Sequence, residues 1–126
     1  MKNTPDAWAK RAKSEGYRSR ASYKLLEINK KHNLISKSSL IFELGSSPGG
    51  WSQVISNNKK SDCECIAIDI LDMKEVEDID FYKLDLYSDK FNEKIEDYSN
   101  SVDLILSDMS VNLSGIKVVD EEGNKD

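Results

Sequence analysis

The stretch LIFELGSSPGGW, residues 40–51, decides the fold that this sequence predicts. Residues 40–44 are short and mostly apolar, which favours a strand. The strand runs directly into a glycine-rich turn, residues 45–50, and a helix is expected from about Trp51 to just before Asn57. Glycine has no Cβ, so such a turn lets the backbone approach a ligand closely. The stretch therefore predicts a ligand at the end of the first strand.

Strands and helices alternate along the rest of the chain, which predicts an α/β fold with a mainly parallel sheet. We expect helices over residues 5–14, from a cap at Ser19 or Ser22 to about Lys31, and over residues 88–98. Further strands are expected over residues 64–69, 80–84 and 102–106. The polar tail, residues 116–126, is expected to remain outside the sheet, which would leave the edge of the fourth strand unpaired.

Length and composition are typical of one folded domain, residues 1–126. Of the 126 residues, 38% are apolar and 33% charged, too apolar for a disordered chain and too charged for a membrane span. The first 13 residues lack the apolar core of a secretory signal. Cys63, Cys65 and the single histidine, His32, form no cluster that predicts a metal site. We therefore expect a cytoplasmic protein with neither a membrane nor a metal partner.

The charge of the chain is divided unevenly. The net charge is −5, yet residues 1–31 hold nine Lys or Arg and three Asp or Glu, whereas residues 32–126 hold nine and twenty. All three arginines, Arg11, Arg18 and Arg20, lie in the first segment, and arginine binds phosphate in a bidentate geometry that lysine cannot match. Residues 1–31 are thus predicted to be a basic helical arm that faces a polyanion.

Acidic residues follow the predicted strands. In a parallel sheet ligands bind beyond the carboxyl ends of the strands, where Asp69, Asp85 and Asp108 all lie. Asp69, about twenty residues beyond the turn, is placed to accept hydrogen bonds from ribose hydroxyls, as in both NAD and S-adenosylmethionine enzymes. Pro48 removes a backbone N–H that a pyrophosphate would need, and Glu43 adds to an acidic cleft. A sulfonium cofactor is therefore favoured over a nicotinamide-dependent oxidoreductase.

Three segments of the sequence resemble one known family. These segments are GYRSRASYKL at 16–25, ELGSSPGGWSQ at 43–53 and SDMSVNLSG at 107–115. Together they resemble the FtsJ/RrmJ family of RNA ribose 2′-O-methyltransferases, and within it the bacterial enzymes that methylate a uridine of 23S rRNA. The resemblance spans residues 6–115. It implies a Rossmann-like fold, S-adenosylmethionine as cofactor, large-subunit RNA as partner, and residues 40–115 as the cofactor-binding half of the sheet.

The resemblance also implies roles for individual residues. It matches Lys24 to the first position of the family's catalytic Lys-Asp-Lys-Glu tetrad. Arg18 and Arg20 of the basic arm are expected to bind RNA because of their charge and their bidentate geometry. Trp51 could equally be a core residue of its helix, and Lys24 a solvated residue of a lysine-rich helix. The positions that match the cofactor contacts of the family are Gly49, Trp51, Asp69, Asp85 and Asp108, and Asp108 also matches the second tetrad position.

The sequence departs from the family at three points, the smallest of which is Gly45-Ser46-Ser47 in place of the commoner Gly-Ala-Ala. Ser110-Val111 stands where the family usually has Ala-Pro, in the loop that faces the target nucleotide. The second lysine and the glutamate of the tetrad have no counterpart in residues 1–126, so we expect only the N-terminal half to two thirds of the domain, with little activity alone. The alternative is a non-catalytic module that binds RNA or the cofactor.

Overall fold

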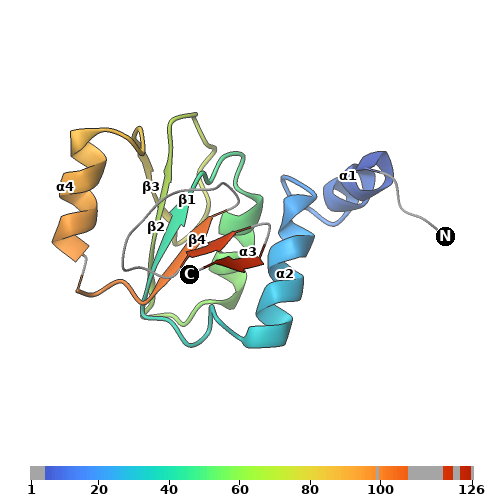
Figure 1. Cartoon of the computed structure of the whole chain (residues 1–126). Coiled ribbons are helices and arrows are strands. Elements are labelled where there is room, and N and C mark those ends of the chain that lie inside the picture. The colour runs from blue at the N-terminus through green and yellow to red at the C-terminus, as the bar shows by residue number, and fades with distance from the viewer. Residues whose placement is uncertain (1–4, 99, 108–117, 121–122, 126) are drawn as a thin grey trace.

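The computed structural model describes residues 5–98, 100–107, 118–120 and 123–125. Its elements (Figure 1) follow in the order α1 (Pro5–Ser14), α2 (Ala21–His32), β1 (Leu40–Leu44), α3 (Gly50–Asn58), β2 (Glu64–Asp69), β3 (Asp80–Lys83), α4 (Asp89–Tyr98), β4 (Leu104–Ser107), β5 (Val118–Asp120) and β6 (Gly123–Lys125). The strands form one sheet in the order β3-β2-β1-β4-β5-β6. Strands β1 to β5 pair in parallel, which confirms the predicted α/β class.

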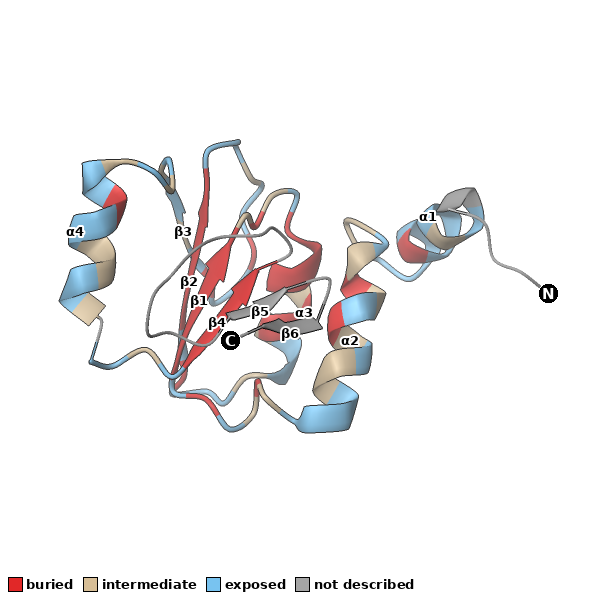
Figure 2. Ribbon diagram, viewed as in Figure 1, coloured by how far each residue is buried: buried red, intermediate tan, exposed pale blue. Residues whose placement is uncertain are grey.

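The sheet separates two hydrophobic layers. All five residues of β1 are buried, as expected for a central strand with helices on both faces. Side chains such as Ile41 pack with α2 and α3 on one face, and side chains such as Phe42 pack with Phe91 of α4 on the other. Figure 2 shows the buried residues concentrated in the central strands and in α3. This packing places the turn between β1 and α3 at one rigid end of the sheet.

One carboxylate joins the starts of the two central parallel strands. The Oδ2 of Asp103 accepts a hydrogen bond from the Ser39 N–H at 2.8 Å, and its Oδ1 accepts one from the Leu40 N–H at 3.0 Å. The Asp103 N–H donates to the Leu40 carbonyl at 3.2 Å. Asp103 thereby pairs donors and acceptors at the entry to β1 and β4, a role that the sequence analysis did not assign.

Two expectations about helix ends are wrong in detail. Ser22 lies inside α2 and is buried, and the N-cap position belongs to Arg20, which makes no side-chain capping bond. The hydroxyl of Ser19 accepts the Ala21 N–H at 3.1 Å instead. The helix after the turn begins at Gly50 rather than Trp51 and extends to Asn58.

The expectation for the tail is also wrong. Strand β5 pairs with β4 in parallel, with Ile105 opposite Val118, and β6 pairs antiparallel with β5. The edge of β4 is thus covered, because an open strand edge presents a row of unpaired N–H and C=O groups that favours pairing with any available segment. The polar composition of residues 116–126 predicted a tail outside the sheet. Strands as short as β5 and β6, with two or three residue pairs each, form only where a strand edge is already present to pair with.

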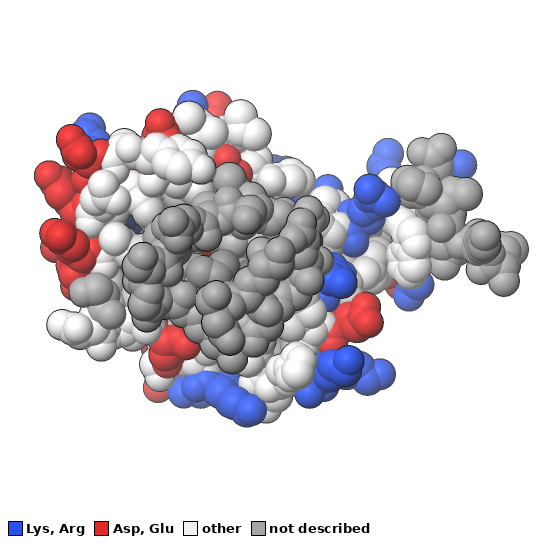
Figure 3. Space-filling model, in the orientation of Figure 1, with Lys and Arg blue, Asp and Glu red and all other residues white. Residues whose placement is uncertain are grey.

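Helix α1 lies beyond α2, on the side away from the sheet (Figure 1). The carbonyl of its buried residue Ala12 accepts a hydrogen bond from the Tyr17 N–H at 2.8 Å. The ring centroids of Trp8 on α1 and Tyr23 on α2 lie 5.3 Å apart. Lys and Arg gather over α1 and α2, whereas Asp and Glu gather over α4 (Figure 3). The charge division predicted from the sequence is therefore a division between two ends of the molecule.

Candidate functional site

The glycine-rich turn lies over the end of β2. The N–H groups of Gly45 and Ser46 both donate to the Ile68 carbonyl, at 2.8 and 3.3 Å. Gly49 has φ of 115°, in the left-handed region that favours glycine, and a Cβ there would lie 2.7 Å from the Arg18 guanidinium. A Cβ on Gly50 would lie 2.7 Å from two serine hydroxyls of the α1–α2 segment. The turn therefore needs both glycines to pack against the N-terminal segment.

Asp69 is the last residue of β2, at the predicted place. Its side chain is only 9% exposed. Its Oδ2 accepts the Ser47 N–H at 2.8 Å and its Oδ1 accepts the Leu71 N–H at 3.0 Å, so the carboxylate holds the turn and the following loop together. A carboxylate has about four lone-pair sites, which leaves acceptor capacity for a ligand.

An apolar pair beside Asp69 was missed by the sequence analysis. Ile70 and Leu71 are 57% and 63% exposed, which is unusual for large apolar side chains that directly follow a buried strand. An apolar surface next to a hydrogen-bonding carboxylate suits a nucleoside, because the base has apolar faces and the ribose has hydroxyls. The sequence does place these two apolar residues directly beyond the strand end, which could have indicated this surface.

Of the other two acids predicted at strand ends, the structure describes Asp85 but not Asp108. Asp85 is exposed two residues beyond β3, and its Oδ1 accepts the Tyr87 N–H at 2.9 Å. The Leu84 N–H donates to the Asp69 carbonyl at 3.0 Å, so Asp69 and Asp85 lie at the same end of the sheet. Asp108 lies outside the described residues, as do residues 109–117, although β4 ends at Ser107, opposite Leu44 of β1.

Glu43 does not contribute to an open acidic cleft as expected. Its side chain is 2% exposed, and its carboxylate accepts a hydrogen bond from the Ser52 hydroxyl on α3. Its position in β1 directs it toward the α3 layer, where it also raises the pKa of the Cys65 thiol, after the larger effect of burial. Burial likewise raises the pKa of Cys63, so both thiols stay protonated and unreactive.

Trp51 is a core residue that also reaches the surface of α2. It is 3% exposed and packs among the buried residues between the sheet and α2. Its Nε1–H donates to the Ala21 carbonyl at 2.7 Å. Lys24, one turn further along α2, is exposed and lines a pocket together with Trp51. The indole thus fixes the N-terminal turn of α2, which carries Lys24.

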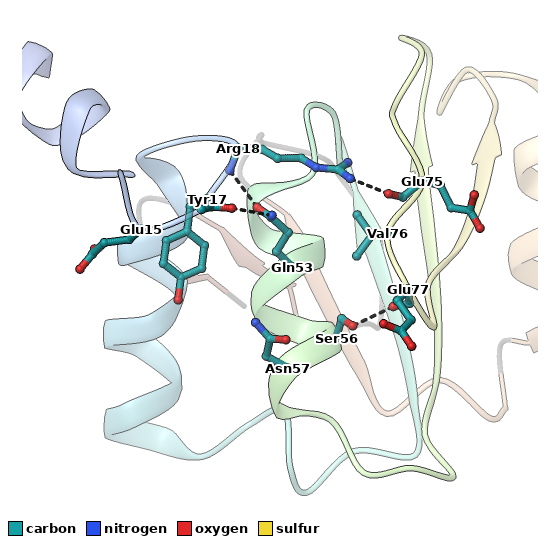
Figure 4. A pocket seen from close by; sticks show the side chains of 10 residues that line it. Glu15, Tyr17, Arg18, Gln53, Ser56, Asn57, Glu75, Val76 and Glu77 are labelled. Carbon is teal, nitrogen blue, oxygen red and sulfur yellow. Dashed lines mark hydrogen bonds between the residues drawn. The ribbon is translucent and has the colours of Figure 1, made fainter. Parts of the chain in front are cut away.

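Arg18 ties three segments together (Figure 4). Its Nη1 donates to the carbonyls of Pro48, at 3.1 Å, and of Lys74, and its Nη2 donates to the Glu75 carbonyl at 2.5 Å. Its backbone N–H donates to Gln53 on α3 at 2.8 Å. These partners belong to the glycine-rich turn and to the loop after β2, so Arg18 braces the loops of the site. Arg20, by contrast, is exposed and makes no ion pair with a described residue.

Replacing Arg18 by alanine is expected to lower the free energy of unfolding by about 1–3 kcal/mol, because three backbone carbonyls lose a charged donor. Arg20→Ala, as matched control, should change it by no more than about 0.5 kcal/mol. Urea denaturation followed by circular dichroism measures both values. An equal, small effect of the two substitutions would contradict the bracing role.

Two classes of feature do not occur in the part of the chain that the structure describes. None of its helices combines the length and apolar character needed to cross a lipid bilayer. Among the same residues, no three or more His, Cys, Asp or Glu side chains group in a way that could hold a metal ion.

The chain is similar to a defined group of known proteins. The model of the FtsJ-like methyltransferase family matches residues 17–125. A protein of Neorickettsia sennetsu named ribosomal RNA large subunit methyltransferase E is 44% identical over 117 residues, which cover 91% of this chain and 54% of that protein. A protein of the same name from Pseudomonas fluorescens is 46% identical, with coverage of 91% and 56%.

A solved structure agrees with these sequence relatives. A Plasmodium falciparum structure that carries the name of a ribosomal RNA methyltransferase superimposes with a TM-score of 0.61 and 32% identity, covering 79% of this chain and 60% of that one. The chain spans about half the length of the curated relatives it matches.

Proposed function

Because the chain belongs to the FtsJ-like methyltransferase family, we propose that it takes part in S-adenosylmethionine-dependent methylation of RNA at a ribose 2′-hydroxyl, with a uridine of 23S rRNA in the cytoplasm as target. The observation that carries the proposal is a site at one end of the sheet that suits a nucleoside. There the glycine-rich turn, the Asp69 carboxylate and the exposed Ile70-Leu71 pair lie together. The names of the relatives support the choice of RNA.

The residues present fit S-adenosylmethionine. Asp69 would accept from the ribose hydroxyls, Ile70 and Leu71 would lie against the adenine, and Gly49 would let the turn approach the remainder of the cofactor. Asp85 lies at the same end of the sheet and presents a second carboxylate. Trp51 would support the cofactor site without a hydrogen bond to the cofactor, since its indole N–H already donates to the Ala21 carbonyl.

The cofactor supplies an electrophilic methyl group, and the protein must position and activate the ribose hydroxyl. Lys24 is exposed on α2, and its ammonium would stabilise the alkoxide that develops as the 2′-hydroxyl loses its proton. The resemblance assigns Asp108 to hold the tetrad lysines, with the proton accepted by the tetrad's second lysine. Alignment of the hydroxyl with the methyl group also lowers the barrier, because the reaction then needs no further ordering of the two groups.

Basic residues on the N-terminal arm support RNA as the substrate. Arg20 and Lys24 are both exposed. Lys and Arg gather over α1 and α2, whereas Asp and Glu gather over α4 (Figure 3). Such an arm attracts phosphates, so binding should weaken as salt concentration rises. The acidic remainder of the protein repels phosphates, so we expect RNA to be attracted to the basic arm alone.

Methylation of the ribose is tested directly with labelled cofactor. The complete gene product is incubated with methyl-labelled S-adenosylmethionine and unmodified large-subunit RNA, and the RNA is then digested to nucleosides. We expect the label in 2′-O-methyluridine. Before digestion, the RNA linkage at the labelled nucleotide should resist alkaline cleavage. Label in a base, or none with a folded protein that binds the cofactor, would contradict the proposal.

A further inference from the structure

A pocket of about 430 Å³ opens between α1 and α2, apart from the turn and Asp69. Its volume falls within the range of about 300–1,000 Å³ that is common for small-ligand sites. The side chains that line it combine aromatic rings with charges: Trp8, Tyr23 and Trp51 with Arg20, Lys24 and Glu27. No role assigned so far uses Trp8, Tyr23 or Glu27.

The aromatic wall of this pocket is fixed by contacts behind it. The Trp8 and Tyr23 ring centroids lie 5.3 Å apart, and the Arg11 guanidinium lies 5.3 Å from the first ring and 4.9 Å from the second. Arg11 also pairs with Glu15 at 3.2 Å, and Glu15 accepts the Tyr23 hydroxyl. Aromatic and cation–π contacts of this kind hold the rings in place, so little side-chain entropy is lost when a ligand binds.

The charged rim of the pocket is open to solvent. Arg20 and Lys24 are four positions apart on the same side of α2, and both are exposed. Neither makes an ion pair with a described residue. Among the described residues nothing neutralises their charges, and two cations beside an aromatic wall suit an anion that carries a flat ring.

We propose that this pocket binds an unpaired RNA base next to the methylated nucleotide, stacked on Trp8, with its phosphate held by Arg20. The inference rests on the proposed function, because RNA is the substrate there. Sites for single-stranded nucleic acid combine aromatic platforms with cations that follow the backbone, and bases are read in unstacked segments. Lys24 lines this pocket and is also the residue proposed to act on the reacting ribose, so a base held here would place the neighbouring ribose beside Lys24.

The test measures whether binding depends on the base and on Trp8. Decauridylate and a decamer of the same ribose-phosphate backbone without bases are titrated into the complete gene product, with no methyl donor. We expect decauridylate to bind about 5- to 100-fold more tightly than the abasic decamer and to quench tryptophan fluorescence. Trp8→Ala should weaken decauridylate binding by that factor and leave binding of the abasic decamer unchanged.

Three variants separate stacking from charge and from folding. Trp8→Phe keeps a ring, so it should retain most of the affinity but lose most of the quenching, since Trp51, which also lines the pocket, is only 3% exposed. Arg20→Ala should weaken both decamers equally. Tyr82→Ala removes an exposed aromatic residue on β3 and should change neither. Should Trp8→Ala fail to fold, Trp8→Phe and the two decamers with the unmodified protein still decide the question.

The outcomes also separate this inference from the proposed reaction. Equal affinity for the two decamers, or decauridylate binding that Trp8→Ala does not weaken, would overturn the base pocket even if ribose methylation occurs. Base-dependent, Trp8-dependent binding supports the pocket whether or not methyl transfer is detected, because the titration contains no methyl donor.

Discussion

Replacement of Lys24 by methionine is expected to lower kcat for ribose methylation by about 10²- to 10³-fold. Methionine preserves the length and apolar stem of the side chain but removes the ammonium that would stabilise the developing alkoxide. The affinity for S-adenosylhomocysteine should not change, since the turn and Asp69 are the proposed cofactor contacts. Single-turnover methylation of RNA by the complete gene product, at saturating RNA and cofactor, measures the chemical step apart from binding.

Lys31→Met is the matched control for this substitution. Lys31 lies on the same helix and is equally exposed, but it does not line the pocket beside Trp51. It should therefore keep full activity. A kcat for Lys24→Met within a few-fold of the unmodified protein, or a loss explained entirely by weaker cofactor binding, would remove Lys24 from the catalytic machinery.

The second large effect is expected at Asp69. Asp69→Ala should weaken S-adenosylhomocysteine binding by about 10- to 100-fold, because hydrogen bonds from the ribose hydroxyls to a charged acceptor are worth about 1.5–3 kcal/mol. The substitution also releases the N–H groups of Ser47 and Leu71, which hold the turn and the next loop. Isothermal titration calorimetry measures the affinity of each variant.

A ligand without ribose hydroxyls separates these two effects of Asp69. The unmodified protein should prefer S-adenosylhomocysteine over its 2′,3′-dideoxy analogue, and Asp69→Ala should lose that preference. If the preference survives in the variant, Asp69 acts only by shaping the turn. Asp62→Ala removes an exposed acid before β2 and should leave both affinities unchanged.

Local patterns in the sequence were sufficient to predict the α/β class, the four strands β1 to β4, and the end of the sheet at which the proposed site lies. The apolar run 40–44 became β1, and Asp69 came to the end of β2, because strand periodicity and turn chemistry act over a few residues. The family resemblance is confirmed over residues 17–125. The functional roles of all the predicted site residues stay predictions: Arg18, Arg20, Lys24, Gly49, Trp51, Asp69, Asp85 and Asp108.

Partners far apart in the sequence were not predictable in this way. Arg18 looked like a phosphate ligand by its type and its basic neighbours, yet its guanidinium donates to carbonyls of Lys74 and Glu75, more than fifty positions away. Glu43 looked like an open acid and lies buried against Ser52. Residue type alone does not reveal whether a charge meets solvent or a backbone group.

The sequence by itself determined the α/β order, the glycine-rich turn, the strand-end carboxylate and the charge division between the arm and the body. Only the tertiary structure decided that Arg18 braces the loops, that β5 and β6 extend the sheet, and that Trp8 and Tyr23 form an aromatic wall next to Arg20 and Lys24. The reason is physical. Backbone preferences are set by near neighbours, whereas a side chain acquires its partner only when packing brings distant segments into contact.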